Sequence, residues 1–209
     1  MTSAKIQSAL AEISSEVVPT IKRLKLASLV TALFREQGIE LVVVEESAIE
    51  FYTEGAYASG DIDLCILSAA EPVTVRLRQE LMGKIGAKGG PRSWKVAGAT
   101  VNVLGEFENA ALTRVRSLAA PYGKLRLAPV EELIVERILV SKFPQEYAPA
   151  ADCAKKIVAS VLCGEIKADW QEVKRLAQTP AYGNWPDVKQ LTDQQAKVFG
   201  KRSPVAASK

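Results

Sequence analysis

The sequence predicts an α+β protein, in which helices flank a mixed sheet and a helical subdomain follows it. Residues 39–45 form a short apolar run rich in valine, which is typical of a strand buried on both faces. Residues 61–67 alternate between polar and apolar side chains, as a strand with one buried face does. From Pro129 onward, apolar residues recur at helical spacing. These three patterns predict the fold class.

Two helices are expected before the first strand. Residues 3–15 have helical periodicity, and a stronger pattern follows the break at 18–20. The apolar face of this second helix contains Leu26, Leu29, Val30, Leu33 and Phe34. Gly38 is expected to end it, because glycine readily adopts the left-handed conformation found after helices.

The segments after the first strand alternate between helices, turns and strands. We expect a helix over 45–53, a loop over 54–60, the strand 61–67, a helix from Pro72 to about Gly86, a turn-rich loop over 86–93, and a hairpin of 93–97 with 100–104 joined at Gly98. Residues 113–128 are expected to contain two short edge segments around the turn at 121–123.

The length of the chain allows one core domain and a small helical appendage. We expect the core, with its N-terminal helices, over 1–128 and the helical subdomain over 129–200. Helices of the subdomain are predicted at 129–143, 149–163, 168–178 and 186–199. Residues 201–209 are expected to form a disordered tail.

Composition excludes several classes of chemistry. The chain has no histidine, so it has no Ser-His-Asp triad, no Cys-His pair and no histidine-ligated zinc or iron. Oxygen ligands remain, and these favour Mg²⁺ or Mn²⁺ if a metal is bound. No apolar run reaches the ~18 residues of a membrane span, and the N-terminus lacks the pattern of a secretory signal. With three cysteines and no close-spaced pair, we expect a cytoplasmic protein.

Charge is unevenly distributed along the chain. Residues 39–67 contain seven acidic residues and no lysine or arginine, although the whole chain has a net charge of +3. Two interpretations stay open. The acidic residues form a solvated surface, or they mark a cation site within a surface that attracts polyanions.

The pattern Asp61-Ile62-Asp63 opens the second predicted strand. Side chains alternate along a strand, so both carboxylates are expected on the same side. Such a pair can hold one or two Mg²⁺ ions, as phosphoryl and nucleotidyl transfer require. The alternative is structural, with Asp61 capping a loop and Asp63 on a solvated strand face.

The segment from strand to strand, LVVVEESAIEFYTEGAYASGDIDLCIL, resembles the bacterial nucleotidyltransferase superfamily, in particular its minimal, toxin–antitoxin-like and uncharacterised branches. A looser resemblance in LRLAPVEELIVERILVSKF and at 152–154 extends it over about 25–160. It implies transfer of a nucleoside monophosphate from an NTP to a hydroxyl of a protein, RNA or small molecule, with Mg²⁺ or Mn²⁺. The residues that the resemblance assigns are Asp61 and Asp63 for the metal, Asn102 for completing the catalytic site, and Ser47, Ser59 and Glu46 for the nucleotide.

The chain departs from the family pattern at two points. Glu45-Glu46 stand where glycine-rich residues accommodate the phosphates, and they would repel a triphosphate. Asn102 stands where many members have a third carboxylate, with Glu106 and Glu108 as possible substitutes. The alternatives to an active transferase are therefore a catalytically degenerate binding module and a toxin–antitoxin component, with a homodimer or an antitoxin as partner.

Overall fold

The computed structural model describes residues 1–108 and 112–206. The chain divides into two compact units, Met1–Phe51 with Ala58–Ala128, and Tyr52–Tyr57 with Pro129–Lys209. Part of the tail expected at 201–209, namely 207–209, lies outside the described residues. Within the described ranges, no helix is long and apolar enough to cross a membrane.

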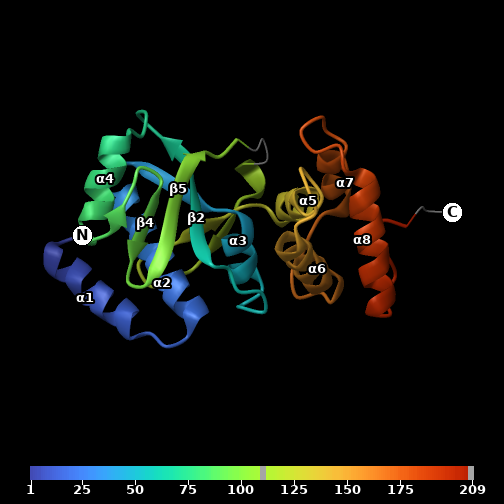
Figure 1. Cartoon of the computed structure of the whole chain (residues 1–209), viewed down its shortest axis with the longest axis horizontal. Coiled ribbons are helices and arrows are strands. Elements are labelled where there is room, and N and C mark those ends of the chain that lie inside the picture. The colour runs from blue at the N-terminus through green and yellow to red at the C-terminus, as the bar shows by residue number, and fades with distance from the viewer. Residues whose placement is uncertain (109–111, 207–209) are drawn as a thin grey trace. The chain divides into compact units, whose positions relative to one another are not determined.

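The first unit combines helices with a sheet (Figure 1). Its helical elements are α1 (Ser3–Ser15), α2 (Pro19–Arg35), α3 (Glu45–Tyr52), α4 (Val75–Gly83) and the short 3-10 helix η1 (Leu112–Arg114). Its strands are β1 (Ile39–Val43), β2 (Asp61–Ala69), β3 (Lys88–Gly89), β4 (Ser93–Val96), β5 (Ala99–Glu106), β6 (Arg116–Leu118) and β7 (Leu125–Leu127).

Among the described residues, the strands form one sheet with the order β3-β4-β5-β2-β1-β7-β6. The pairs β2–β5 and β1–β7 are parallel, and the other neighbours are antiparallel. The predicted α+β fold with a mixed sheet is therefore confirmed. Strand β2, which begins with the predicted aspartates, is the central strand of the seven.

Strand β1 lies inside the sheet because its side chains are apolar on both faces. Leu41, Val42 and Val43 are fully buried. Helix α2 packs against β1 with the apolar face that the sequence predicted, and Leu26, Leu29 and Leu33 on that face are buried. This packing fixes one side of the sheet as the core of the first unit.

The β4–β5 hairpin has the short turn that the sequence predicted at Gly98. Val96 pairs with Ala99, so Ala97 and Gly98 form a two-residue turn. Both have positive φ angles, 49° and 80°, as a type I′ turn requires. This turn matches the twist of the two strands and fixes their register.

Three sequence predictions for the first unit were wrong in detail. The loop expected at 86–93 contains the two-residue strand β3, and α4 ends at Gly83. Gly89 permits β3 to fold tightly against β4, since a Cβ there would lie 2.4 Å from the backbone oxygen of Ser93. Two short edge strands were expected within 113–128. Only β6 is an edge strand of the sheet, because β7 lies between β1 and β6. Three residues are too few for alternation to reveal whether a strand is inside a sheet.

The second unit is helical in its C-terminal part. Its helices are α5 (Val130–Val140), α6 (Ala148–Leu162), α7 (Trp170–Ala177) and α8 (Trp185–Val198). They occur where helical spacing predicted them, with ends that differ by a few residues. Helix α5 packs against the other three, and Asn184 donates a 2.9 Å hydrogen bond to the Val135 carbonyl.

Candidate functional site

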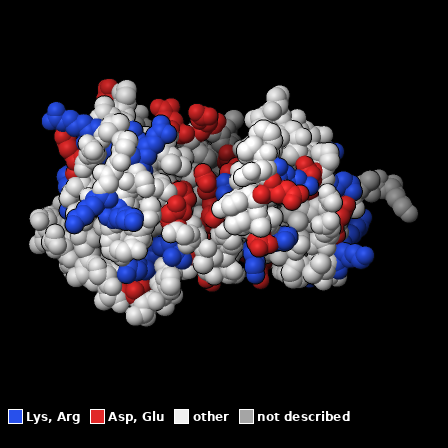
Figure 2. All heavy atoms as spheres, viewed as in Figure 1, with Lys and Arg blue, Asp and Glu red and all other residues white. Residues whose placement is uncertain are grey.

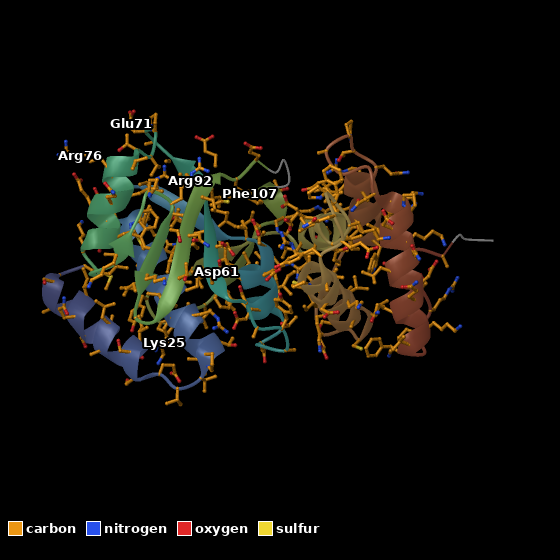
Figure 3. All side chains as sticks on the ribbon, viewed as in Figure 1. Lys25, Asp61, Glu71, Arg76, Arg92 and Phe107 are labelled. Atoms are coloured by element: carbon orange, nitrogen blue, oxygen red, sulfur yellow. The ribbon has the colours of Figure 1, made fainter. Side chains whose placement is uncertain are left out.

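Three predicted residues meet where β2 begins, at the position that Figure 3 marks with Asp61. Asp63 is paired with Asn102 of β5, so their side chains leave the same face of the sheet. The Asn102 amide nitrogen donates to Asp61 Oδ2 and to Asp63 Oδ1, both at 2.9 Å. Asp61, Asp63 and Asn102 therefore form one cluster, which is called the carboxylate–amide cluster below.

Ser47 connects α3 to this cluster. Its hydroxyl oxygen accepts a 2.8 Å hydrogen bond from the backbone N–H of Asp63. The hydroxyl lies 3.2 Å from both the Asp61 carbonyl oxygen and Asp63 Oδ2, and it can donate to either. Only 1% of Ser47 is exposed. In this conformation its side chain positions β2, and a contact with a nucleotide stays a prediction.

Ser59, in the loop before β2, also forms hydrogen bonds that hold the backbone at the start of β2. Its hydroxyl donates to the Asp61 carbonyl at 3.0 Å, and 4% of the residue is exposed. Its backbone N–H donates to Glu50 Oε2 at 3.1 Å. Ser59 thus fixes the backbone from which Asp61 projects, and its predicted contact with phosphate is untested by this geometry.

Glu50 is a residue of this region that sequence reasoning missed. It is fully buried on α3, and it accepts hydrogen bonds from Thr20 Oγ1 at 2.6 Å, from both Arg23 Nε at 2.7 Å and Nη2, and from the N–H of Ser59. The arginine neutralises the buried carboxylate. The only sign of a buried carboxylate in the sequence is that Glu50 lies among apolar residues at 48–51. This sign does not identify Arg23 as its partner.

Glu45 and Glu46 begin α3, one residue after the end of β1, and both are half-buried. Glu45 has a φ of 54°, a left-handed conformation that favours glycine. The backbone therefore keeps the shape for which the family resemblance implied glycine, although this chain has a glutamate there. Glu46, predicted at the nucleotide, lies beside Ser47 at the same end of the helix.

Glu106 and Glu108 do not complete the cluster as substitutes for a third carboxylate. Glu106 is paired with Ile66, three residues beyond Asp63, or about 10 Å along the strand. Glu108 follows the end of β5. Within residues 1–108 and 112–206, no three His, Cys, Asp or Glu side chains form a group that could hold a metal ion. Asn102 therefore stands where the family resemblance implied a third carboxylate.

The electrostatics of the cluster favour a positive partner or a proton. Asp63 is 7% exposed, and its burial raises the pKa of its carboxyl group. The neighbouring Asp61 raises the same pKa further, while hydrogen bonds from Asn102 and Ser47 lower it. Because the net direction is upward, the ionised carboxylate of Asp63 is destabilised by its surroundings.

Replacing Asp63 by asparagine is expected to maintain or raise stability at pH 7. The folded protein binds the Asp63 proton more tightly than the unfolded chain, so the wild type loses stability as the pH rises from about 4 through the raised pKa. Asparagine has no such loss, and its Oδ1 can accept from Asn102 while its amide nitrogen faces the Ser47 hydroxyl. Urea unfolding at several pH values measures this, with the exposed Asp152→Asn as a control. A folded Asp63→Asn protein with lower stability at pH 7 would contradict it.

The cluster fits a divalent cation of the Mg²⁺ type. One amide nitrogen lies 2.9 Å from an oxygen of each aspartate, so a cation near this position can reach both carboxylates. Rotation of the Asn102 amide would replace its nitrogen by its oxygen as a further ligand. Mg²⁺ is commonly held by one or two carboxylates together with substrate phosphates. Asp61, Asp63 and the Asn102 oxygen satisfy that requirement.

Comparison with known proteins is informative at the level of the fold. No protein-family model and no curated protein sequence matches the chain. The crystal structure of an antigenic nucleotidyltransferase-like protein from Paracoccidioides brasiliensis is similar, with a TM-score of 0.52 and 13% identity over 85% of this chain and 96% of that chain.

Two structures of the antibiotic-resistance factor ANT(2'')-Ia are also similar. Its solution structure has a TM-score of 0.49 and 14% identity, covering 74% of this chain and 88% of that chain. Its complex with adenylyl-2''-tobramycin has a TM-score of 0.48 and 13% identity, covering 74% and 94%. The fold assignment depends on the fungal structure. The chain has a nucleotidyltransferase-like fold, as the pattern at 39–67 predicted.

Proposed function

We propose that this protein transfers a nucleoside monophosphate from an NTP to a hydroxyl acceptor, with Mg²⁺ or Mn²⁺ held by Asp61 and Asp63. The observation that supports this most directly is the carboxylate–amide cluster, in which both carboxylates converge on one point. The fold is the one expected for this chemistry. The acceptor is a protein, an RNA or a small molecule.

In the proposed reaction the acceptor oxygen forms a bond to the α-phosphorus of the NTP. The bond from that phosphorus to the bridging oxygen breaks, pyrophosphate leaves, and the hydroxyl proton is released to solvent. The metal ion supplies charge neutralisation of the phosphates. Asp61 and Asp63 hold the ion, and Asn102 completes the site through its amide oxygen.

The remaining residues position this machinery. Ser47 and Ser59 hold the backbone of Asp61 and Asp63 through hydrogen bonds of 2.8–3.2 Å. Glu50 fixes the loop that carries Ser59. These contacts restrict the two carboxylates to one geometry, which lowers the cost of organising the site when a metal binds. Contacts of Ser47, Ser59 and Glu46 with the nucleotide remain part of the proposal.

A catalytically degenerate binding module is the second candidate. Two features favour it. Asn102 brings no charge to the metal, and Glu45-Glu46 place negative charge at the beginning of α3. Such a protein would keep the fold and lack transfer activity, either alone or as a component of a toxin–antitoxin pair.

Thermal stability with NTP and Mg²⁺ tests the proposal. At about 100 times its dissociation constant, a nucleotide should stabilise the wild type by about 2.7 kcal/mol. The Asp61→Ala/Asp63→Ala variant should show no such gain. Mn²⁺ should substitute for Mg²⁺, and each metal alone is the control for a nucleotide-independent effect.

The transfer reaction is then measured with labelled NTPs and candidate acceptors. Nucleotide-dependent stabilisation that needs both aspartates, together with release of pyrophosphate, supports an active transferase. Stabilisation without pyrophosphate release under any acceptor supports the degenerate module. Equal stabilisation of the wild type and the double variant would place any nucleotide site elsewhere.

A further inference from the structure

A row of directly paired residues crosses four strands and ends at the carboxylate–amide cluster. Asp61 of β2 is paired with Thr100 of β5, Thr100 with Lys95 of β4, and Lys95 with Lys88 of β3. Side chains of directly paired residues leave the same face of a sheet. Lys88 and Lys95 therefore lie on the face from which Asp61 projects.

This face of the hairpin strands is open. Lys88, Ser93 and Lys95 are exposed, whereas the intervening Trp94 and Val96 point to the core and are buried. Adjacent strands lie about 4.8 Å apart, so Lys95 is about 10 Å and Lys88 about 14 Å from Asp61 at the level of the backbone. The two ammonium groups can reach a ligand that extends from the cluster across β5.

The pairing of the two lysines is unfavourable in the absence of an anion. Like charges directly opposite each other on a sheet destabilise it. Neither lysine side chain forms an ion pair or hydrogen bond with residues 1–108 or 112–206. Residues 74–100 contain six lysines and arginines and one acid, Glu80. Figure 2 shows Lys and Arg gathered over the β4 side of this face and acidic residues over the β2 side.

The opposite side of the cluster carries acidic residues. Strand β1 adjoins β2 on the side away from β5, and Glu45 and Glu46 begin the helix that follows β1 after one residue. A ligand with an anionic chain that binds at the cluster is attracted toward β4 and β3 by Lys95 and Lys88.

We propose that Lys95 and Lys88 bind the phosphate chain of the nucleotide, which extends from the cluster over β5 and away from α3. This inference rests on the proposed function and adds the location of the phosphates. The second of the two interpretations of the charge pattern, a cation site within a surface that attracts polyanions, is thereby assigned to particular side chains. Thr100, between Asp61 and Lys95, has a hydroxyl that can donate to the same chain.

Calorimetric titration of the full chain with the four NTPs and with inorganic tripolyphosphate, each with Mg²⁺, tests the inference. Lys88→Gln/Lys95→Gln should weaken binding of both ligand types by about 10-fold, the worth of two exposed charge-assisted contacts. The matched control is Lys5→Gln/Lys124→Gln, which removes two exposed lysines elsewhere in the first unit and should change affinity by less than about 2-fold. Circular dichroism checks that both variants are folded.

A further variant tests the alternative location. Glu45→Gln/Glu46→Gln should change the affinity for tripolyphosphate by less than about 3-fold, because neither glutamate is among the proposed phosphate contacts. A 10-fold gain in that variant, with no loss in Lys88→Gln/Lys95→Gln, would place the phosphates at α3 and overturn the inference.

The outcomes separate the inference from the proposed function. Nucleotide binding that is equal in Lys88→Gln/Lys95→Gln and in the control overturns the inference and leaves the function standing. Tripolyphosphate binding that depends on the two lysines, without nucleotide binding, supports the row as a polyphosphate site and contradicts the function. A single-stranded oligonucleotide is titrated in the same way. If Lys88→Gln/Lys95→Gln loses only the binding of this oligonucleotide, the row holds an acceptor and the inference fails.

Discussion

Replacing Arg23 by methionine is expected to lower the free energy of unfolding of the first unit by about 3–5 kcal/mol. Arg23 is the charged partner of Glu50, which is fully buried, and only 14% of the arginine side chain is exposed. Methionine fills a similar volume but removes the positive charge and both hydrogen bonds that Arg23 gives to the carboxylate. Thr20 and the Ser59 N–H still contact Glu50, and two neutral donors do not replace a cation.

Urea unfolding measures this effect, followed by circular dichroism and tryptophan fluorescence. The transition of the first unit should move to lower urea, while that of the second unit stays in place. Arg76→Met is the control, because Arg76 pairs with Glu80 on the surface, where its side chain is 89% exposed, and should cost at most about 0.5 kcal/mol. Equal effects of the two substitutions would show that the Arg23–Glu50 pair contributes nothing beyond a surface pair.

Replacing Asn102 by aspartate is expected to make the fold dependent on a divalent cation. The amide nitrogen now donates to both aspartates at 2.9 Å, and a carboxylate in its place loses both hydrogen bonds and adds repulsion. Without metal, we expect the free energy of unfolding at pH 7 to fall by about 2–4 kcal/mol. With Mg²⁺, three carboxylates bind the ion more tightly than the wild-type site, and stability returns.

Thermal unfolding across a range of Mg²⁺ concentrations measures this dependence. The control is Asn102→Ala, which removes the amide without adding charge and should respond to Mg²⁺ no more than the wild type does. If Asn102→Asp were as stable as the wild type without metal and insensitive to Mg²⁺, the three side chains could not converge as described.

Much of the fold followed from the sequence because its strongest elements have unambiguous patterns. The four consecutive apolar residues at 41–44 leave neither face of that strand polar, so its position inside the sheet followed. Alternation at 61–67 placed Asp61 and Asp63 on one side, and the structure brings them together. Asn102 was identified because it is the strongly polar residue within an apolar strand, and the parallel register places it opposite Asp63.

Features that depend on pairing between distant segments did not follow from the sequence. Glu50 and Arg23 are 27 residues apart, and nothing local identifies one as the partner of the other. The row from Asp61 to Lys88 depends on the register of four strands, one of which is only two residues long. The pairing register of two strands is set by the turn between them and by which side chains are buried on one face. Sequence patterns do not predict either with single-residue precision.

The two outermost strands of the sheet also bear on self-association. Strand β3 has two residues and includes Lys88, and β6 has three and begins with Arg116. Short, cationic edge strands expose few unpaired backbone groups and repel their own copies, which hinders joining of sheets from two molecules. Two copies of this chain should therefore associate through side-chain surfaces of their helices, without forming a continuous sheet across the two molecules.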